Sequence, residues 1–272
     1  MTIKLVTNEK IAETSSKGNQ EKWHDKETNK WYKLDQFGYE ALTETLISII
    51  LEKSNIESDT PFTFVRYNMD KFRIRGLERT GCVSDNFLQP AQSLITVNRL
   101  LTNYLGFPLR QKLMRLSSTK KRIAYLAEAT AEYTGLKEFP RYLTLLFEID
   151  SLFCNDDRHL NNIAVIEQSG KYSYCPIFDN AAGLLSNTQL SGMDIEPKAL
   201  ISVLQARPFN TTFTRQMNSA RSLYKQQLVL PPPNPDEIRE TLQPLLMHYA
   251  ERDRGIISNR IIKCIMLRYK FA

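Results

Sequence analysis

The order of hydrophobic and polar positions predicts strands in the first part of the chain. Residues 21–35, EKWHDKETNKWYKLD, have the alternation of two short strands around the turn DKETN, with Lys33 on one face and Tyr32 on the other. Residues 38–55 instead carry leucine and isoleucine at helical spacing. β-Branched and aromatic residues return over residues 62–83, so the pattern predicts strands interrupted by one helix.

From Pro90 onward the hydrophobic spacing is that of helices. The one predicted interruption is a hairpin, with strands at 162–166 and 171–178 around the turn EQSG. The other segments have a helical period, and they are 93–105, 119–134, 139–153, 211–228 and two more after the proline break PPPNP.

These patterns predict an α+β chain with two lobes. The small β-rich lobe is expected over residues 1–88, and the larger helical lobe with its hairpin over residues 89–272. Hydrophobic residues make up 42% of the 272 positions, which is enough for a sizeable core in either lobe.

Composition excludes several classes of protein. The net charge of +6 is mild, and it fits a solvated basic surface as well as an anionic partner. Four cysteines without a C-x-x-C pair and three dispersed histidines argue against a zinc ribbon or a histidine-rich metal site. The N-terminus lacks the apolar core of a signal peptide, and the longest apolar run, LISIIL, is too short to span a bilayer. We therefore expect a reduced, soluble, cytoplasmic protein.

The stretch CNDDRHLNN, residues 154–162, places many polar residues directly after a predicted helix. Asp157 and Asn162 stand at Asp-x-x-x-x-Asn spacing, and Asp179 follows at the end of the hairpin. Phosphoryl transfer uses such a set, because one carboxylate accepts a hydroxyl proton while a second carboxylate and an amide hold magnesium ions. A hairpin brings its two ends together, so Asn162 and Asp179 can share a metal.

A lysine in the first lobe completes the pattern. Lys33 lies in a predicted strand, and Glu40 and Glu44 lie early in the following helix. A strand lysine that pairs with a helical carboxylate orients the nucleotide phosphates in kinases. We expect Glu40 to be the partner rather than Glu44, because Glu40 lies nearer to the helix start and to the end of the strand.

Each of these residues also has a purely structural interpretation. Asp157, Asn162 and Asp179 are residue types common in turns and caps, and a single lysine most often lies on the surface. Arg158 and His159 are expected to brace the loop rather than to react. The joint occurrence of the set, in this order and in a β-lobe followed by an α-lobe, favours the catalytic interpretation.

The stretches CNDDRHLNN and PIFDNAAGLL resemble the HipA-like protein kinases, whose catalytic loop precedes a metal-binding aspartate. The stretches WYKLDQFGYEALTETLISIILEKSN, GCVSDNFL and KEFPRYLTLLFEIDSLF are also similar to a compact bacterial branch of this group, so the resemblance covers most of the chain. The phosphoinositide kinases, with an Asp-Arg-His-x-x-Asn loop, are more distantly similar. The chain is much shorter than full-length HipA, and no G-x-G-x-x-G precedes Lys33.

The resemblance implies a two-lobed kinase-like fold that uses ATP and Mg²⁺. By this match Asp157 is the catalytic base, Asn162 and Asp179 are the metal ligands, and Lys33 contacts the phosphates. The segment 82–88 is implied to be the interlobe hinge beside adenine, and the adenine-contacting residues are expected to include Val83, Ser84 and Phe87. The phosphate-covering loop is expected in TSSKGNQ, through Ser15 and Ser16, since HipA-like kinases carry a serine-bearing and sometimes autophosphorylated loop there.

The resulting expectation is a kinase that phosphorylates a serine or threonine hydroxyl of a protein, itself included. Two alternatives remain open. The same fold also serves lipid and small-molecule kinases, and it serves pseudokinases that only bind a partner. Neither a direct nucleic-acid partner nor a membrane span is expected.

Overall fold

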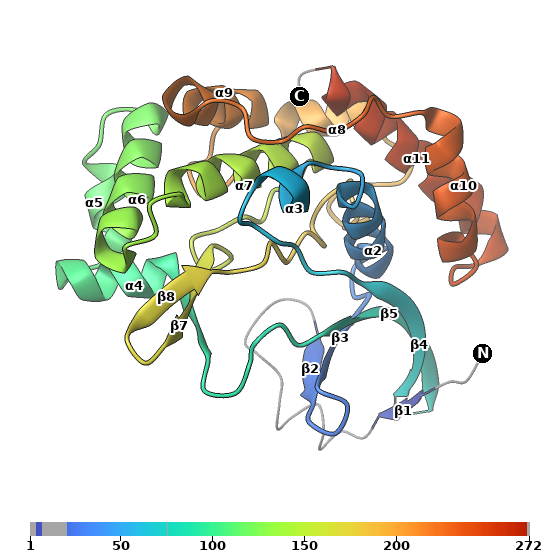
Figure 1. The fold of residues 1–272 in the computed structure, drawn as a ribbon. Helices are drawn as coiled ribbons and strands as arrows, with labels where there is room; N and C mark the ends of the chain where they lie inside the picture. Colours follow the sequence, from blue (N-terminus) through green and yellow to red (C-terminus); the bar gives the residue numbers. More distant parts are fainter. Residues whose placement is uncertain (1–3, 7–20, 75, 271–272) are drawn as a thin grey trace.

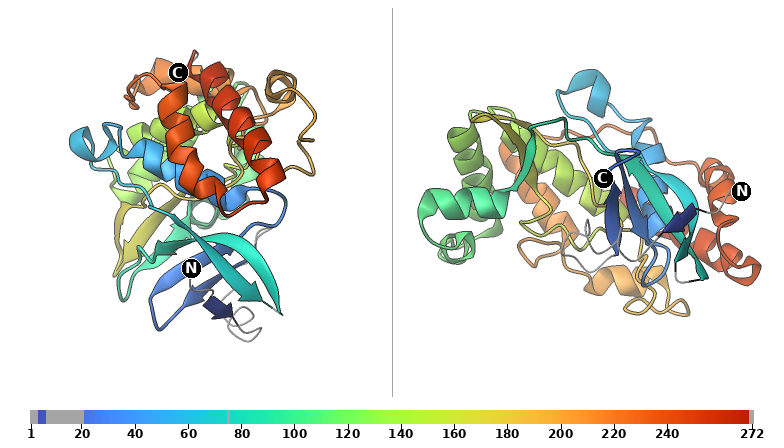
Figure 2. Two further views of the ribbon diagram at one scale, coloured as in Figure 1. Left: turned by 90° about the vertical axis from the view of Figure 1, so that its right-hand side faces the viewer. Right: turned by 90° about the horizontal axis from the view of Figure 1, so that it is seen from below.

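The computed structural model describes residues 4–6, 21–74 and 76–270 as a mixed α+β fold. A five-stranded sheet forms most of the N-terminal part, and helices with a smaller sheet form the C-terminal part (Figure 1). The side view in Figure 2 shows the helices stacked over the larger sheet. The predicted fold class, a β-rich region followed by a helical one, is confirmed.

The larger sheet has the strand order β1-β4-β5-β3-β2. Its strands are β1 (Lys4–Val6), β2 (Lys22–Asp25), β3 (Lys30–Leu34), β4 (Asn68–Ile74) and β5 (Leu77–Asp85). β1 is parallel to β4 and the other pairs are antiparallel, so the predicted hairpin around DKETN is confirmed as β2–β3. On one face Tyr32 stacks on Trp23 with ring centroids 5.2 Å apart, next to the buried Phe72.

Helix α2 (Glu40–Leu51) is the predicted helix of the N-terminal part, and the short helix α3 (Ile56–Asp59) follows it. Leu42, Leu46 and Ile47 of α2 are fully buried in the main hydrophobic core, together with residues of the C-terminal helices. α2 therefore lies between the large sheet and the helical part, and it packs against both (Figure 1).

The helical part is built around α7, in which every residue from Tyr142 to Phe153 is buried. A helix buried on all sides must be surrounded by others, and α6, α9 and α11 pack against it. The helices of this part are α4 (Val97–Leu105), α5 (Leu109–Met114), α6 (Thr119–Thr134), α7 (Phe139–Phe153), α8 (Pro197–Val203), α9 (Phe213–Tyr224), α10 (Pro235–Leu246) and α11 (Glu251–Tyr269). In the ranges that the structure describes, no helix has both the length and the apolar character to cross a bilayer.

The smaller sheet corrects the prediction of a helix from residue 93. Residues Ser93–Thr96 form strand β6, which pairs with β7 (Ala164–Gln168), and β7 pairs with β8 (Lys171–Tyr174). Helix α4 begins only at Val97, because the Thr96 side chain accepts a hydrogen bond from the Arg99 N–H and caps the helix there. The predicted hairpin thus supplies two strands of a three-stranded sheet, with β7 at its centre and β8 at one edge.

The N-terminal and C-terminal parts are joined at several places, among them a β-bridge between Phe64 and Ile177. The chain itself crosses once from β5 to β6, over residues 86–92. In addition, the segment just before α2 is hydrogen-bonded to the segment that follows Asp179. Gly38 forms a β-bridge with Asn187, and the Tyr39 hydroxyl donates to the Leu184 carbonyl at 2.8 Å.

Candidate functional site

Lys33 lies at the centre of a buried cluster of charges between the two parts. It is 7% exposed, and its Nζ donates to Asp179 Oδ1 at 2.9 Å and to Glu44 Oε1. Burial disfavours the ammonium ion, but the carboxylates of Asp179 and Glu44 outweigh this and hold the pKa of Lys33 well above its ordinary value. The cluster therefore joins β3, α2 and the end of the β7–β8 hairpin through one fixed positive charge.

The partner of Lys33 on α2 is Glu44, so the prediction that Glu40 pairs with Lys33 is wrong. The Glu40 carboxylate accepts hydrogen bonds from the backbone N–H groups of Phe37 and Gly38, at 2.7 and 3.0 Å, and it fixes the turn that precedes the helix. Glu44 lies one turn further along and is fully buried. Its Oε2 accepts from the Asn180 N–H at 3.0 Å, so it also fixes the backbone next to Asp179.

Asp179 has a backbone φ of +63°, a conformation that a non-glycine residue adopts at some cost. Burial raises the pKa of its carboxyl, but the charges of Lys33 and Lys22 outweigh burial and hold that pKa below its ordinary value. Asp179 is therefore a carboxylate under physiological conditions, and it is aimed into the space between the two parts.

Asp157 lies in the loop that follows α7, and the side chains of the loop fix its backbone. The Asp157 N–H donates to Asn155 Oδ1 at 3.2 Å, and the Asp157 carbonyl accepts from Asn162 Nδ2 at 3.0 Å. The His159 N–H donates to the same carbonyl at 2.7 Å. Asp157 and Asn162 are thus held together by the loop itself, as their spacing predicts.

Arg158 is fully buried and links this loop to α7 and to the segment around Asp179. Its guanidinium binds both carboxylate oxygens of Asp150 at 3.0–3.1 Å, the Phe178 carbonyl at 2.7 Å and Asn180 Oδ1 at 2.6 Å. Burial disfavours both charges. Pairing with Asp150 outweighs burial at Arg158 and raises the pKa of its guanidinium, whereas burial dominates at Asp150 and raises the pKa of that carboxyl. The structure places Arg158 as a brace between the two halves of the site.

The carboxylate of Asp157 points to a more exposed region, with 41% of its side chain accessible. Arg207 Nη1 lies 3.1 Å from Asp157 Oδ1, and His159 Nε2 lies 4.0 Å from Asp157 Oδ2. Arg207 follows α8, and its own carbonyl accepts a hydrogen bond from the buried Gln216 side chain at 2.8 Å. No local sequence pattern indicates Arg207, because it stands fifty residues beyond Asp157 and outside any motif.

Asp156 also differs from an ordinary surface carboxyl. Burial and the adjacent charge of Asp157 raise its pKa to about 6, against a smaller opposing effect of Arg207. Two neighbouring acidic side chains thus have different environments, since Asp157 faces Arg207 and Asp156 is largely withdrawn from water.

The raised pKa of Asp156 predicts a pH-dependent stability. The folded protein keeps this proton up to about pH 6, whereas the unfolded chain loses it near pH 3.8, so the stabilisation falls as the pH rises through this window. Asp156→Asn should remove the effect and change the difference in unfolding free energy from wild type by about 1–3 kcal/mol between pH 4 and 8. Urea titrations at both pH values measure it. Asp35, whose pKa burial raises to about 7, is present in both proteins and cancels in the comparison. Equal pH slopes for the two proteins would contradict the assignment.

Lys22 brings a second cation to the cluster. It stands directly opposite Lys33 in the β2–β3 pair, and cross-strand partners share one face of a sheet. Burial lowers the pKa of Lys22, while Asp179 opposes this and Lys33 adds to it. The predicted hairpin contained the signal for Lys22, since its register around DKETN pairs residues 22 and 33.

The three residues expected beside adenine have different positions. Ser84 lies opposite Trp31 and shares the face of Lys33, whereas Val83 packs with the aromatic cluster around Tyr32 on the other face. Phe87 follows the strand, and its ring lies 5.9 Å from that of Phe178, the residue before Asp179. Val83 is therefore turned away from the site, and Ser84 and Phe87 lie on its side. Ser15 and Ser16 fall outside the described residues.

The oxygen donors of the cluster are of the kind that Mg²⁺ prefers. No group of three or more His, Cys, Asp or Glu side chains is placed to hold a metal ion in the part of the chain that the structure describes. Mg²⁺ sites in phosphoryl-transfer proteins use only one or two protein carboxylates, with substrate phosphates and water as the other ligands. The Asn162 NH₂ donates to the Asp157 carbonyl, which leaves the Asn162 Oδ1 outside this bond, so the donor atoms of Asn162 and Asp179 are of the type that fits the ion.

The fold has counterparts among solved structures. No family model matches the sequence, and no curated protein matches it either. The crystal structure of the Helicobacter pylori proinflammatory kinase CtkA superposes with a TM-score of 0.61 at 13% identity, over 95% of this chain and 94% of that one. HipA from Shewanella oneidensis MR-1, in complex with HipB and operator DNA, gives a TM-score of 0.47 at 11% identity, over 94% of this chain and 64% of that one. The likeness to CtkA shows that the chain has a kinase-like fold, as the resemblance to HipA-like kinases predicts.

Proposed function

We propose that this protein is an ATP- and Mg²⁺-dependent kinase that transfers the γ-phosphoryl group to a serine or threonine hydroxyl of a protein. The observation that carries the proposal is the ion-pair cluster, in which Lys33 contacts both Glu44 and Asp179 beside the Asp157–Asn162 loop. A buried lysine held by two carboxylates from separate elements is the arrangement that positions nucleotide phosphates in kinases. The kinase-like fold, shared with a protein named as a kinase, supports it.

In this proposal residues 1–88 bind the nucleotide and residues 89–272 carry the catalytic loop. Lys33 and Lys22 lie on one face of the large sheet and supply positive charge to the phosphates. Ser84 and Phe87 lie on the side where adenine would be bound. Asn162 and Asp179 would hold Mg²⁺, which neutralises phosphate charge when it is bound.

Asp157 accepts the proton of the attacking hydroxyl. The new bond forms between the substrate oxygen and the γ-phosphorus, the bond to ADP breaks, and the hydroxyl proton passes to the Asp157 carboxylate. Arg207 holds Oδ1 of this carboxylate at 3.1 Å, which orients the second oxygen. The proposal that the acceptor is a serine or threonine hydroxyl is based on the resemblance to HipA-like kinases.

The decisive experiment measures transfer of labelled γ-phosphate with Mg²⁺, to the protein itself and to a panel of protein, inositol lipid and small alcohols. Label in phosphoserine or phosphothreonine supports the proposal. Label confined to lipid or alcohol would move the substrate to another class. Calorimetry with an ATP analogue and Mg²⁺ accompanies the assay, and absence of binding would favour a non-catalytic binding module.

Substituting each of the two glutamates of α2 in turn tests which one contributes to the use of ATP. Glu44→Gln removes the charge that faces Lys33, so we expect kcat/KM for ATP to fall about 10- to 100-fold, the effect of losing a charged hydrogen bond. Glu40→Gln keeps an acceptor for the turn before α2 and should change kcat/KM less than about threefold. Steady-state kinetics on both variants measure this, and a larger loss in Glu40→Gln would restore Glu40 as the functional partner.

A further inference from the structure

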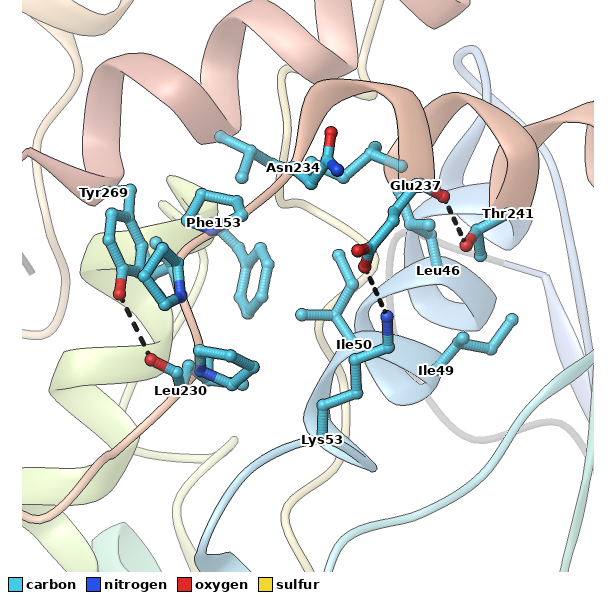
Figure 3. A pocket seen from close by; sticks show the side chains of 16 residues that line it. Leu46, Ile49, Ile50, Lys53, Phe153, Leu230, Asn234, Glu237, Thr241 and Tyr269 are labelled. Atoms are coloured by element: carbon cyan, nitrogen blue, oxygen red, sulfur yellow. Dashed lines mark hydrogen bonds and ion pairs between the residues drawn. The ribbon is translucent and has the colours of Figure 1, made fainter.

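A cavity of about 130 Å³ lies behind α2, apart from the charge cluster. Its walls are the second half of α2, the end of α7, the Pro231–Pro233 segment, α10 and α11. Ile50 and Phe153 face each other across the space, and Lys53 meets Glu237 at one side (Figure 3). Lys33, Glu44, Asp157 and Asp179 are absent from its lining, so the cavity is separate from the candidate nucleotide site.

The lining defines the chemistry of a ligand. Most of the wall is made by leucine, isoleucine, proline and aromatic side chains. The charged lining residues, Lys53 and Glu237, neutralise each other with Nζ and Oε2 3.0 Å apart. The Tyr269 hydroxyl already donates to the Leu230 carbonyl at 3.1 Å. The lining therefore has no net charge, and its tyrosine donor is already used.

We propose that this cavity is a binding site for an uncharged, apolar molecule about the size of one aromatic ring. Its volume is close to that of cavities, about 150 Å³, that take up benzene when they are lined by apolar side chains. The apolar lining and the absence of net charge thus define the ligand of the site.

The position of the cavity couples its ligand to α2. Leu46 and Ile50 form one wall and belong to the same helix as Glu44. Phe153 forms the opposite wall and ends α7, and its carbonyl accepts from the Leu184 N–H at 2.6 Å. A ligand that contacts both walls gains these contacts only while α2 is seated against α7, so it stabilises that arrangement.

The test uses benzene as the probe and the whole chain. Benzene at about ten times its Kd should raise Tm by about 3 °C and slow amide hydrogen exchange in α2. α5, which lies far from the cavity lining, should exchange at an unchanged rate. A Tm and an α2 exchange rate that benzene leaves unchanged would overturn the proposal, and neither readout depends on nucleotide.

Two matched variants locate the bound probe. Ile50→Trp fills the cavity and should abolish the benzene effect, whereas Ile256→Trp makes the same substitution on the outer, 51% exposed side of α11 and should retain it. Ile50→Phe adds less volume and replaces Ile50→Trp if that variant does not fold. A full benzene effect in the filled variant would place the probe elsewhere and overturn the assignment.

The consequence for catalysis rests on the proposed function. Since α2 carries the partner of Lys33, benzene should increase the affinity for an ATP analogue a few-fold, and the analogue should increase the affinity for benzene by the same factor. An unchanged analogue affinity would overturn this coupling while the binding of benzene stands. Absence of any analogue binding would instead count against the proposed kinase.

Discussion

Asp157→Asn is expected to lower the rate of phosphoryl transfer about 10²- to 10⁴-fold, the contribution of a general base in the transition state. The asparagine keeps an oxygen at the position of Oδ1, so the contact with Arg207 and the shape of the loop should persist. Affinity for an ATP analogue should stay within about threefold of wild type, because the lost group acts on the hydroxyl proton and not on the phosphates. Single-turnover assays and calorimetry measure the two quantities.

The adjacent carboxyl provides the control for this experiment. Asp156→Asn removes one carboxyl from the same loop at the next position, but burial dominates the pKa of Asp156, whereas Asp157 forms the ion pair with Arg207. We expect its transfer rate to remain within about tenfold of wild type. Transfer by Asp157→Asn at the wild-type rate would remove Asp157 from the role of base.

Arg158→Met is expected to lower the free energy of unfolding by about 3–5 kcal/mol, the largest effect on stability that we predict. The substitution leaves the Asp150 carboxylate buried without its partner, and it removes the donors to Phe178 and Asn180. An unpaired charge in a water-free site costs far more than the pair contributes, which is why the loss is large. Urea unfolding followed by circular dichroism gives the value.

Two further variants separate this pairing from a general effect of losing an arginine. Arg110→Met changes an exposed arginine and should alter the unfolding free energy by no more than about 0.5 kcal/mol. The double variant Asp150→Leu with Arg158→Met removes both charges and should recover part of the loss, because no buried ion remains unpaired. A loss in Arg158→Met no greater than that in Arg110→Met would show that the buried pair does not stabilise the loop.

The sequence predicts correctly those helices and strands whose hydrophobic pattern repeats over several residues. The helices over 119–134 and 139–153 and the hairpin after Asn162 all appear, because each repeats its pattern over several residues. Residues 93–96 were assigned to a helix and form β6, since four residues carry too little periodicity to distinguish strand from helix. Only the pairing with β7, seventy residues away, decides the conformation of this segment.

The residues of the candidate site also fall into two groups, those that a local pattern predicts and those that depend on tertiary packing. The Asp157 loop and Asp179 are set by local spacing and a hairpin, so the sequence was sufficient to find them. The partner of Lys33 could not be predicted, because it depends on how the loop before α2 turns. In the structure Glu44 faces Lys33, and Glu40 binds the backbone of the turn. Arg207 reaches Asp157 through tertiary packing alone, which no local pattern records.

The contacts of Gly38 and Tyr39 with residues 184–187 limit how the two parts can move against each other. Lobes joined by one covalent strand can swing about that point in any direction. Here residues 86–92 connect the two parts covalently, and backbone contacts at the Gly38–Asn187 and Phe64–Ile177 bridges join them at further points. A movement of one part against the other must therefore break some of these contacts or carry the joined segments along together. As long as its contacts with Gly38 and Tyr39 hold, the segment beyond Asp179 moves together with the start of α2.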